Sequence, residues 1–447
     1  MARYDLARFG TTHNSYSGGD RGSLPRQLDL GIRDLELDFH DNGFEQLKDY
    51  RVGHLKPGAE VALGNGNPAT LLLGDWLGVI ASWSNAHPGH GPVTVTLDAK
   101  DDLTDNDAGG DLEDLNGILE AAFGARLFTR DDRDRDSGWR DTDQLRDRVL
   151  CVLSGAGSTR AAYRWAYGSD PAIAVNARGA AVLAYRSTVG DLSCWTGTVS
   201  RAEPRIDWRR KATFGFSGLG LRQPVIVIDD QGWVVAAYAF GPRAGFQGPS
   251  LESKVGRLQD DGRIVWYGSS VFAQGSAPSL SLLGDEVLEV HTMWDGQRRQ
   301  RVRGVLNRRK RKVEWQSPRA TEQRPFVRDV ATWEGRELGC EVDAAGVIIS
   351  GFTQRLQPVR FRQLAFVEEQ KGDDPRVIRD ALFFAADAKD RAAVAESRNR
   401  GLVARAWGYE QGDQSSPPSL PQENMPATDT PQAAWYQAYM TGPEVAV

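Results

Sequence analysis

The first hundred residues of the chain carry most of the side chains that could do chemistry. Five of its six histidines lie before residue 91. One histidine and one amide stand together in Thr-His-Asn-Ser-Tyr, and two carboxylates alternate in Leu-Glu-Leu-Asp. A Gly-His pair and an Asp-Ala-Lys run follow. The candidates are the histidines His13 and His54, the oxygen-bearing side chains of Asn14, Glu36, Asp38 and Asp98, and the amine of Lys100.

These residue types together suit the metal-assisted cleavage of a phosphodiester. Carboxylate and amide oxygens are the ligands that Ca²⁺ and Mg²⁺ prefer, so the four oxygen-bearing residues are candidate metal ligands, with Ca²⁺ expected and Mg²⁺ as the alternative. Histidine titrates near neutral pH, so the two histidines could divide the base and acid roles. The lysine shares a strand face with Asp98 and could neutralise the charge that develops on a phosphoryl group.

Two further candidates lie in the last quarter of the chain. Trp407 stands in Ala-Arg-Ala-Trp and could line a substrate pocket or simply pack in the core. Glu368 follows an expected strand and could join the same site, or it could be an ordinary surface acid. We expect both to contribute to substrate binding.

Strands and helices alternate in the first part of the sequence. A strand over 32–39 would place three carboxylates on one side and three apolar residues on the other, because successive side chains alternate between faces. Such a strand suits a barrel whose helices cover the outside. Four strand–helix units are expected: strands over 5–10, 32–39, 92–100 and 148–153, with helices over 71–83 and 112–123 among the connections.

The middle of the chain repeats with a period of 53 to 54 residues. Three segments begin at Pro171, Pro224 and Pro278, and each leads into a second short strand. The units close with Ile-Asp-Trp, Ile-Val-Trp and Val-Glu-Trp, and a weaker fourth copy begins at Pro325. About four short strands per fifty residues is typical of propeller blades.

Strand–helix alternation then returns, with strands expected over 363–367, 381–385, 401–409 and 425–430. Four units before the repeats and four after them make eight. The predicted fold class is therefore α/β: a (β/α)8 TIM barrel split by an inserted all-β propeller-like repeat domain. The expected divisions are 1–158 for the first half of the barrel, 159–357 for the inserted domain and 358–447 for the second half.

Taken in order, the His-Asn pair, the Glu-x-Asp strand, the Gly-His pair and the strand-borne acid resemble the phospholipase C-like phosphodiesterase superfamily of TIM-barrel enzymes. The pattern is most similar to calcium-dependent phosphoinositide-specific phospholipase C. The Asp98-x-Lys100 run and Trp407 are more similar to the spider-venom sphingomyelinase D branch, and the former also to glycerophosphodiester phosphodiesterases. Thr428-Asp429 resembles the last-strand ending of these barrels, and the repeats resemble the blades of bacterial lectin-like propellers.

The resemblance implies a phosphoric diester hydrolase or lyase with His13 as general base and His54 as general acid. The expected substrate is a phospholipid of the phosphatidylinositol type or a glycerophosphodiester. The sequence has no evident counterpart of the basic residues that read inositol phosphates in eukaryotic enzymes, so the head group stays open. One alternative is a sphingomyelinase D-like phospholipase that releases a cyclic phosphate. Another is a glycan- or surface-binding protein with an inactive barrel, and the inserted domain could bind such a ligand in either case.

Composition narrows the partners and the location. The 447 residues suggest two or three domains at roughly 150 residues each. The net charge of -6 argues against nucleic acid, and no apolar run is long enough for a transmembrane segment, although a peripheral membrane contact is expected to be feasible. The basic run Arg308–Lys312 is either a solvated hairpin loop or a contact to phosphate or an anionic membrane. We expect secretion, with the leader absent from this chain; a cytoplasmic location is the alternative.

Overall fold

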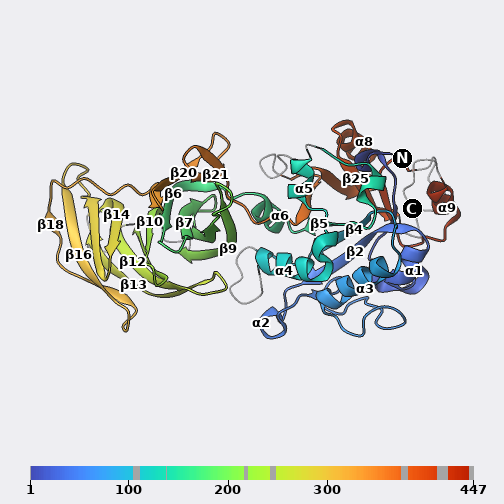
Figure 1. Ribbon diagram of the computed structural model, residues 1–447, viewed down its shortest axis with the longest axis horizontal. Helices are drawn as coiled ribbons and strands as arrows, with labels where there is room; N and C mark the ends of the chain where they lie inside the picture. The colour runs from blue at the N-terminus through green and yellow to red at the C-terminus, as the bar shows by residue number, and fades with distance from the viewer. Residues whose placement is uncertain are drawn as a thin grey trace. The chain divides into compact units, whose positions relative to one another are not determined.

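The computed structural model of the protein describes residues 2–103, 111–136, 138–215, 220–241, 248–373, 381–409 and 421–441. The chain divides into two compact units. The barrel unit combines Met1–Arg164 with Gln363–Val447, and the inserted unit is Trp165–Arg362. In Figure 1 the barrel unit is therefore coloured from both ends of the scale, blue to teal and orange to red, whereas the inserted unit is green to orange.

Eight parallel strands close into a barrel in the barrel unit, which confirms the closed parallel barrel expected from the sequence. Around the barrel they run β1-β26-β25-β24-β23-β5-β4-β2, and β1 pairs with β2 to close the ring. The two strands that flank the inserted unit in sequence, β5 and β23, pair directly. The strands are β1 (Gly10–Thr12), β2 (Ile32–His40), β4 (Val93–Ala99), β5 (Val149–Gly155), β23 (Ala365–Gln370), β24 (Phe383–Asp387), β25 (Val403–Tyr409) and β26 (Met425–Thr428).

The expected first strand over 5–10 is wrong. Residues Tyr4–Leu6 form a 3-10 turn, η1, and the strand begins only at Gly10. Tyr4 and Phe9 are buried and pack in a tilted arrangement with 4.8 Å between ring centroids, and Tyr4 also stacks on Trp139. The aromatic packing of this segment, rather than pairing in a sheet, explains its apolar residues.

Helices connect the strands on the outside of the barrel (Figure 1). The most regular ones are α3 and α4, whose buried apolar residues recur at helical spacing, as in Trp76, Leu77 and Ile80 of α3. The side chain of Asp111 caps the first turn of α4 by accepting from the backbone N–H groups of Glu113 and Asp114. The helices are α1 (Leu24–Asp29), α2 (Phe44–Leu47), α3 (Leu73–Ala86), α4 (Leu112–Phe123), α5 (Arg130–Arg135), α6 (Gly157–Arg164), α8 (Arg391–Asn399) and α9 (Ala434–Met440). None of the helices in the described part of the chain is long and apolar enough to cross a membrane.

Every residue of β2 is buried, and this strand explains how acids come to line the barrel interior. Leu35, Leu37 and Phe39 point to the opposite face from Asp34, Glu36 and Asp38, since strand side chains alternate. A short strand, β3 (Arg51–Val52), pairs antiparallel with the end of β2 and opens the loop that carries His54.

Four antiparallel sheets make up the described part of the inserted unit, and their propeller-like arrangement agrees with the repeats in the sequence. We call them sheets 1 to 4 in chain order; three have four strands, and sheet 3 has β18 as a fifth. Sheet 1 is β6 (Gly168–Val175), β7 (Ala180–Ser187), β8 (Leu192–Val199) and β9 (Ile206–Gly215); sheet 2 is β10 (Arg222–Ile228), β11 (Trp233–Phe240), β12 (Ser250–Leu258) and β13 (Ile264–Gln274); sheet 3 is β14 (Ser276–Leu283), β15 (Glu286–Thr292), β16 (Arg299–Asn307), β17 (Lys312–Trp315) and β18 (Arg319–Ala320); sheet 4 is β19 (Val330–Trp333), β20 (Arg336–Val342), β21 (Ile348–Phe352) and β22 (Arg355–Pro358).

The repeated residues have repeated structural roles. The residue before each repeat proline, Asp170, Gln223 and Ala277, has φ between 48° and 54°, and the pairing register shifts at each of these points. Two of the closing tryptophans reach a neighbouring sheet: the indole N–H of Trp208 donates to Ser350 and that of Trp315 to Ser253, both at 2.9 Å. The tryptophans therefore join adjacent sheets.

A buried acid–histidine pair lies in sheet 3. Nδ1 of His291 is 2.8 Å from Oε2 of Glu289, and both side chains are fully buried. Burial raises the pKa of Glu289 above its usual range, although the hydrogen bond and charge of His291 oppose the rise. This pair faces the packed core between sheets 2 and 3, because Glu289 and His291 lie on the same face of β15 as Val287, which belongs to that core.

Candidate functional site

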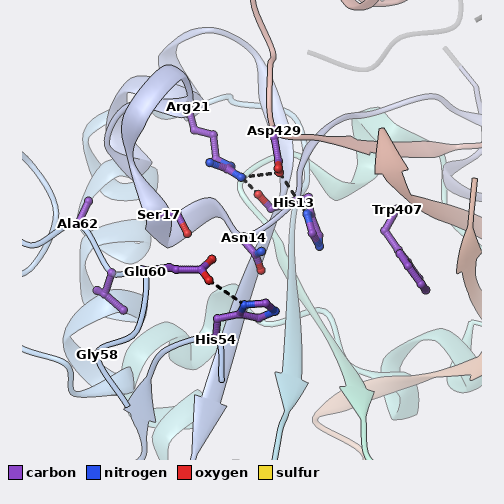
Figure 2. A pocket seen from close by; sticks show the side chains of 11 residues that line it. His13, Asn14, Ser17, Arg21, His54, Gly58, Glu60, Ala62, Trp407 and Asp429 are labelled. Atoms are coloured by element: carbon purple, nitrogen blue, oxygen red, sulfur yellow. Dashed lines mark hydrogen bonds and ion pairs between the residues drawn. The ribbon is translucent and has the colours of Figure 1, made fainter. Parts of the chain in front are cut away.

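Two adjoining cavities lie at the end of the barrel where the parallel strands finish. Their volumes are about 780 and 790 Å³, and they share His13, His54 and Trp407 in their linings. Figure 2 shows these three side chains around the first cavity. In parallel barrels this end is where catalytic residues gather, because every strand–helix loop leaves the barrel there.

His13 follows β1 and is held by Asp429, which follows β26. Nδ1 of His13 lies 3.1 Å from Oδ1 of Asp429, and its Nε2 lies 3.9 Å from Oε2 of Glu36. His13 and Asp429 are 416 positions apart in sequence, but they meet because β1 and β26 are neighbouring strands. Arg21 pairs with the same Asp429 oxygen, and its Nε donates to the backbone oxygen of His13 at 2.6 Å (Figure 2).

The charges around His13 favour its protonated form. Burial lowers the pKa of His13, but the carboxylates of Glu36 and Asp429 outweigh burial and raise it. Burial likewise raises the pKa of Asp429, but the hydrogen bond from His13 and the charge of Arg21 outweigh it and lower that pKa. The imidazole can therefore accept a proton and be stabilised once it holds one.

The turn after β1 brings an amide and a phenol to the acids of β2. Asn14 has φ 47°, a left-handed conformation that asparagine tolerates better than most residues. Its backbone N–H donates to Oε2 of Glu36 at 2.9 Å, and Oγ of Ser15 accepts from the N–H of Glu36 at 2.8 Å. The Tyr16 hydroxyl lies 3.1 Å from Oδ1 of Asn14 and 3.0 Å from Oδ2 of Asp38.

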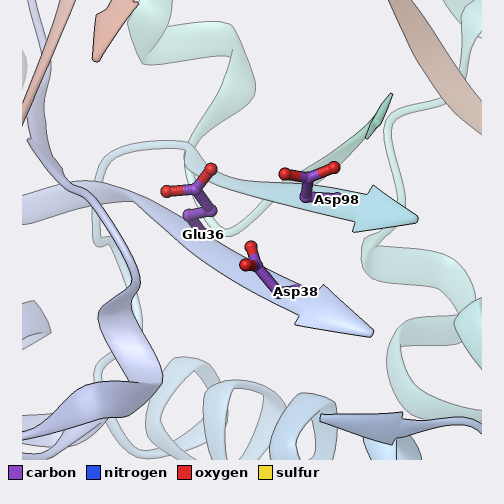
Figure 3. A group of neighbouring side chains, drawn as sticks. All are labelled: Glu36, Asp38 and Asp98. Atoms are coloured by element: carbon purple, nitrogen blue, oxygen red, sulfur yellow. The ribbon is translucent and has the colours of Figure 1, made fainter. Parts of the chain in front are cut away.

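Three carboxylates converge at the ends of β2 and β4. Glu36 and Asp38 come from β2 and Asp98 from β4, where Asp38 and Asp98 stand opposite each other (Figure 3). One oxygen of each carboxylate lies within 4.8 Å of the other two. Gly155 at the end of β5 leaves the necessary space: it has φ 86°, and a Cβ there would lie 2.4 Å from Oδ1 of Asp98.

Lys100 partly neutralises this cluster. Its Nζ lies 2.7 Å from Oδ2 of Asp98 and 2.9 Å from Oδ2 of Asp38. Burial opposes the charge of Lys100, but Asp98 and Asp38 outweigh it and raise the lysine pKa. Burial, together with Glu36 and Asp98, raises the pKa of Asp38 to about 8. Lys100 lowers the pKa of Asp38, whereas burial and the two neighbouring carboxylates raise it. The raising effects are stronger, because burial and two carboxylates act against one ammonium group.

Arg405 from β25 lies inside the barrel and fixes the charge of Glu36. Its side chain is 4% exposed, and its Nη2 lies 2.9 Å from Oε2 of Glu36 while its Nε lies 3.5 Å from Oδ2 of Asp34. Burial raises the pKa of Glu36, but Arg405, His13, the backbone N–H of Asn14 and Lys100 together outweigh burial and lower that pKa to about 2. Burial raises the pKa of Asp34 to about 7 in spite of Arg405 and of the hydrogen bond from Thr96. Glu36 is thus held as a carboxylate next to His13.

His54 stands on the far side of the first cavity from His13 (Figure 2). Its Nδ1 lies 3.1 Å from Oε1 of Glu60, and about a third of its side chain is exposed. Nε2 of His40 lies 3.1 Å from the backbone oxygens of both Gly53 and His54, so it anchors the loop after β3. Glu60 and the anchored loop therefore orient the ring of His54, which stays accessible from the cavity.

The two residues expected to bind substrate differ in position. Trp407 is 38% exposed and lines both cavities. Glu368 is buried: its Oε1 accepts from Ser154 and, at 2.9 Å, from Nε2 of Gln370, and burial raises its pKa. Among the described residues, Ser154 and Gln370 line the second cavity and Glu368 does not. A substrate-binding role of Glu368 stays a prediction.

The acidic cluster fits a hard divalent cation. Oδ1 of Asp38 and Oδ1 of Asp98 are buried and accept no hydrogen bond from any described residue. A buried carboxylate oxygen without a partner is costly, and a cation would satisfy both atoms. Glu36, Asp38 and Asp98 are the residues that could hold it, and the carboxylates outnumber the cationic groups Lys100 and Arg405 around them. The Tyr16 hydroxyl connects Asn14 to this cluster, because it contacts both Oδ1 of Asn14 and Oδ2 of Asp38.

Several residues of the site were not among the sequence-based candidates. The most prominent are Arg405, Asp429, Arg21 and Glu60. Arg405 alternates with Trp407 on one strand, so the strand pattern could have placed it on the inner face. Arg21 and Asp429 pair across separate loops, and Glu60 pairs with His54 within the irregular loop after β3, so no strand or helix spacing indicates these three residues.

No protein-family model matches the chain, and no curated protein matches it. Among solved structures, a calcium-dependent phosphoinositol-specific phospholipase C from Pseudomonas sp., a Gram-negative bacterium, is 21% identical with a TM-score of 0.29, over 35% of this chain and 59% of that one. A calcium-dependent phosphatidylinositol-specific phospholipase C from Streptomyces antibioticus is 22% identical with a TM-score of 0.31, over 34% and 54%. AofleA from Arthrobotrys oligospora is 11% identical with a TM-score of 0.25, over 46% and 60%.

The chain thus spans less than three-fifths of the length of each of these two phospholipases. These similarities are low.

Proposed function

We propose that the barrel unit is a metal-dependent phosphodiesterase of the phospholipase C-like, TIM-barrel type, acting on a phospholipid or a glycerophosphodiester. The observation that carries the proposal is the meeting of two histidines and an acidic cluster around one end of a closed barrel. His13 and His54 line the same two cavities, and the second cavity also contacts Glu36, Asp98 and Lys100. The reaction requires a base, an acid and charged groups that bind the phosphate or its metal ion, and this end of the barrel has candidates for all three.

In this proposal His13 is the general base. Its Nδ1 is engaged by Asp429, which favours the tautomer with the proton on Nδ1 and the lone pair on Nε2. Nε2 can then take the proton of the attacking hydroxyl, which is a head-group hydroxyl or a water. As the new phosphorus–oxygen bond forms, the bond to the departing alcohol breaks, and His54 donates the proton that this oxygen needs. Glu60 holds the imidazole ring of His54 in place.

The acidic cluster, through a bound cation, and Lys100 would balance the negative charge of the phosphate. A cation held by Glu36, Asp38 and Asp98 would neutralise the phosphate oxygens when bound. Lys100 adds a positive charge next to Asp98, on the wall of the second cavity. Trp407 offers a flat apolar surface at the rim for the part of the substrate next to the phosphate.

A second candidate reaction uses the same site. Lys100 lies between two acids and Trp407 lines the cavity, which suits a sphingomyelinase D-like transfer that produces a cyclic ceramide or lysolipid phosphate. The two reactions differ in which phosphorus–oxygen bond breaks, so their products differ.

Product analysis tests the proposal. Phosphatidylinositol, sphingomyelin and glycerophosphocholine are each incubated with the protein, with and without Ca²⁺ or Mg²⁺, and the products are identified by mass spectrometry. A cyclic inositol phosphate supports the phospholipase C reaction, and a cyclic ceramide phosphate supports the alternative. His13→Ala and His54→Ala should each abolish turnover. His87→Ala is the matched control, because His87 lies at the end of α3 and lines neither cavity.

Full activity in both His13→Ala and His54→Ala would overturn the proposal. Activity that survives complete chelation would remove the metal but keep the two histidines. Binding to a glycan array, combined with no hydrolysis of any of the three substrates, would instead favour a binding protein with an inactive barrel.

A further inference from the structure

Sheet 3 of the inserted unit has a charge opposite to that of the chain as a whole. Between residues 276 and 320, ten Lys and Arg stand against five Asp and Glu, a net charge of +5, whereas the whole chain carries -6. The run Arg308–Lys312 contributes half of the basic residues, but it forms only the hairpin between β16 and β17. The other basic residues lie on or next to the strands, so the charge belongs to the sheet and not to one loop.

The strand register places several of these basic residues on one face. Residues directly opposite each other in an antiparallel pair share a face of the sheet. Arg301 of β16 stands opposite Arg319 of β18, and Arg299 and Arg303 share the face of Arg301 because they lie two positions away on β16. The opposite face carries Val302, which is fully buried against sheet 2. We call the face with the arginines the outer face of sheet 3.

The outer face also carries exposed aliphatic side chains. Leu283 of β14 and Val305 of β16 both stand opposite Glu286 of β15, so all three share this face. Leu283 is 81% exposed and Val305 is 51% exposed. Basic and aliphatic residues thus share one face of the sheet: Val305 lies two positions beyond Arg303 on the same strand.

Much of the positive charge on this face is not compensated. Arg299, Arg301 and Arg319 form no ion pair with any acid in the described part of the chain, and Arg299 and Arg319 are exposed. The two acids on the face are partly neutralised: Glu314 pairs with Lys310 at 2.8 Å, and Glu286 lies 3.9 Å from Arg303. Three uncompensated arginines therefore cluster at one end of the sheet.

We propose that the outer face of sheet 3 docks on the surface of an anionic phospholipid bilayer. Arginines next to anionic head groups gain electrostatic attraction, and the aliphatic side chains at the other end of the same face gain from insertion among the head groups. A nucleic acid or a sulfated glycan would use the arginines but would leave Leu283 and Val305 exposed to water. Membrane docking goes beyond the proposed phosphodiesterase activity. Vesicle binding is measured without turnover, so the docking proposal and the activity proposal can each fail alone.

Vesicle co-sedimentation of the full chain tests the proposal. We expect binding to vesicles of mixed phosphatidylcholine and phosphatidylglycerol at low salt, little binding to pure phosphatidylcholine, and release at about 0.5 M NaCl, where the screening length is only a few ångströms. The variant R299Q/R301Q/R319Q should bind at least tenfold more weakly, since each basic residue at an anionic surface contributes about fivefold. L283S/V305S should also bind more weakly to these vesicles, but not to heparin.

The control variant R178Q/R209Q/R222Q removes the same charge from three exposed arginines on sheets 1 and 2 and should bind like the unmodified chain. Circular dichroism and melting of each variant show whether the fold is retained. Failure of the unmodified chain to bind the anionic vesicles at low salt would overturn the proposal. So would equal weakening of vesicle binding by the control variant. Vesicle binding that L283S/V305S leaves unchanged, in a chain that also binds heparin, would overturn it as well, because it would assign the face to a soluble polyanion.

Discussion

The Nδ1 atom of His13 lies 3.1 Å from Oδ1 of Asp429, although 416 residues separate them in the chain. Their contact exists because the barrel closes through β1, which pairs with β26 on one side and β2 on the other. Closure therefore does two things at once: it gives His13 a carboxylate partner and places its Nε2 3.9 Å from Glu36. The base of the proposed reaction depends on the completion of the whole barrel.

Asp429→Asn should lower kcat by about tenfold or more while the protein stays folded. The amide can no longer stabilise a protonated His13, and the preferred tautomer of the ring is lost. The pKa of His13 should fall, since Asp429 contributes to raising it, and NMR titration of the His13 ring measures that change. Asp20→Asn, an exposed acid next to Arg21, is the matched control. Unchanged kcat in Asp429→Asn would show that His13 needs no carboxylate partner.

Asp38→Asn and Asp98→Asn should each weaken the binding of Ca²⁺ at least about tenfold, because each removes a carboxylate with an unpartnered buried oxygen. Isothermal titration calorimetry measures the affinity directly and does not require activity. Asp75→Asn on α3 removes an exposed acid outside the cluster and should leave the affinity unchanged. Equal affinities in all variants would place the metal elsewhere or remove it from the proposal.

Arg405→Met should destabilise the barrel unit by about 3–5 kcal/mol in free energy of unfolding. The substitution leaves Glu36 and Asp34 buried without the guanidinium that lies 2.9 and 3.5 Å from them, and an uncompensated buried charge is costly. Chemical denaturation followed by circular dichroism measures the difference. Arg398→Met, an exposed arginine at the end of α8, should cost far less. If both variants unfold at the same denaturant concentration, the interior ion pairs do not stabilise the barrel.

Glu289 should make the inserted unit less stable as the pH rises above about 4.5, the usual pKa of its carboxyl group. Burial raises its pKa in the folded state, so the unfolded state loses its proton first and is stabilised over that window. Below the window the carboxyl is protonated in both states, and above the folded pKa the loss is complete. Glu289→Gln should therefore flatten the fall in the free energy of unfolding. Glu286→Gln changes an exposed acid on the same strand and should keep it; identical curves for all three proteins would exclude Glu289 as the cause.

The sequence predicts the faces of strands better than their depth. The alternation in β2 correctly indicated that Glu36 and Asp38 share one side, because a period of two follows directly from strand geometry. The same alternation places Arg405 and Trp407 on one side of β25, yet Arg405 is buried inside the barrel and Trp407 lies at its rim. Depth along a strand depends on how far each neighbouring strand extends, and no local pattern encodes that.

Contacts between loops could not be predicted from the sequence. Asp429, the partner of His13, is indicated by the sequence only as part of a last-strand ending, and Glu60, the partner of His54, is an ordinary acid in its local sequence. Their roles appear only when the closure of the barrel and the loop after β3 bring them to the rings. The repeats, in contrast, were visible at once, because each antiparallel sheet is built from residues that are close in sequence.

The barrel unit also holds together the two points at which the chain leaves it and returns. The backbone oxygen of Tyr163 accepts from Nε2 of Gln363 at 2.7 Å, and the Tyr163 hydroxyl accepts from the N–H of Ala365 at 3.0 Å. A few linking residues could therefore span the gap that 198 residues now fill. The inserted unit could therefore be exchanged for another domain, by evolution or by design, without a change in the eight strands that carry the candidate site.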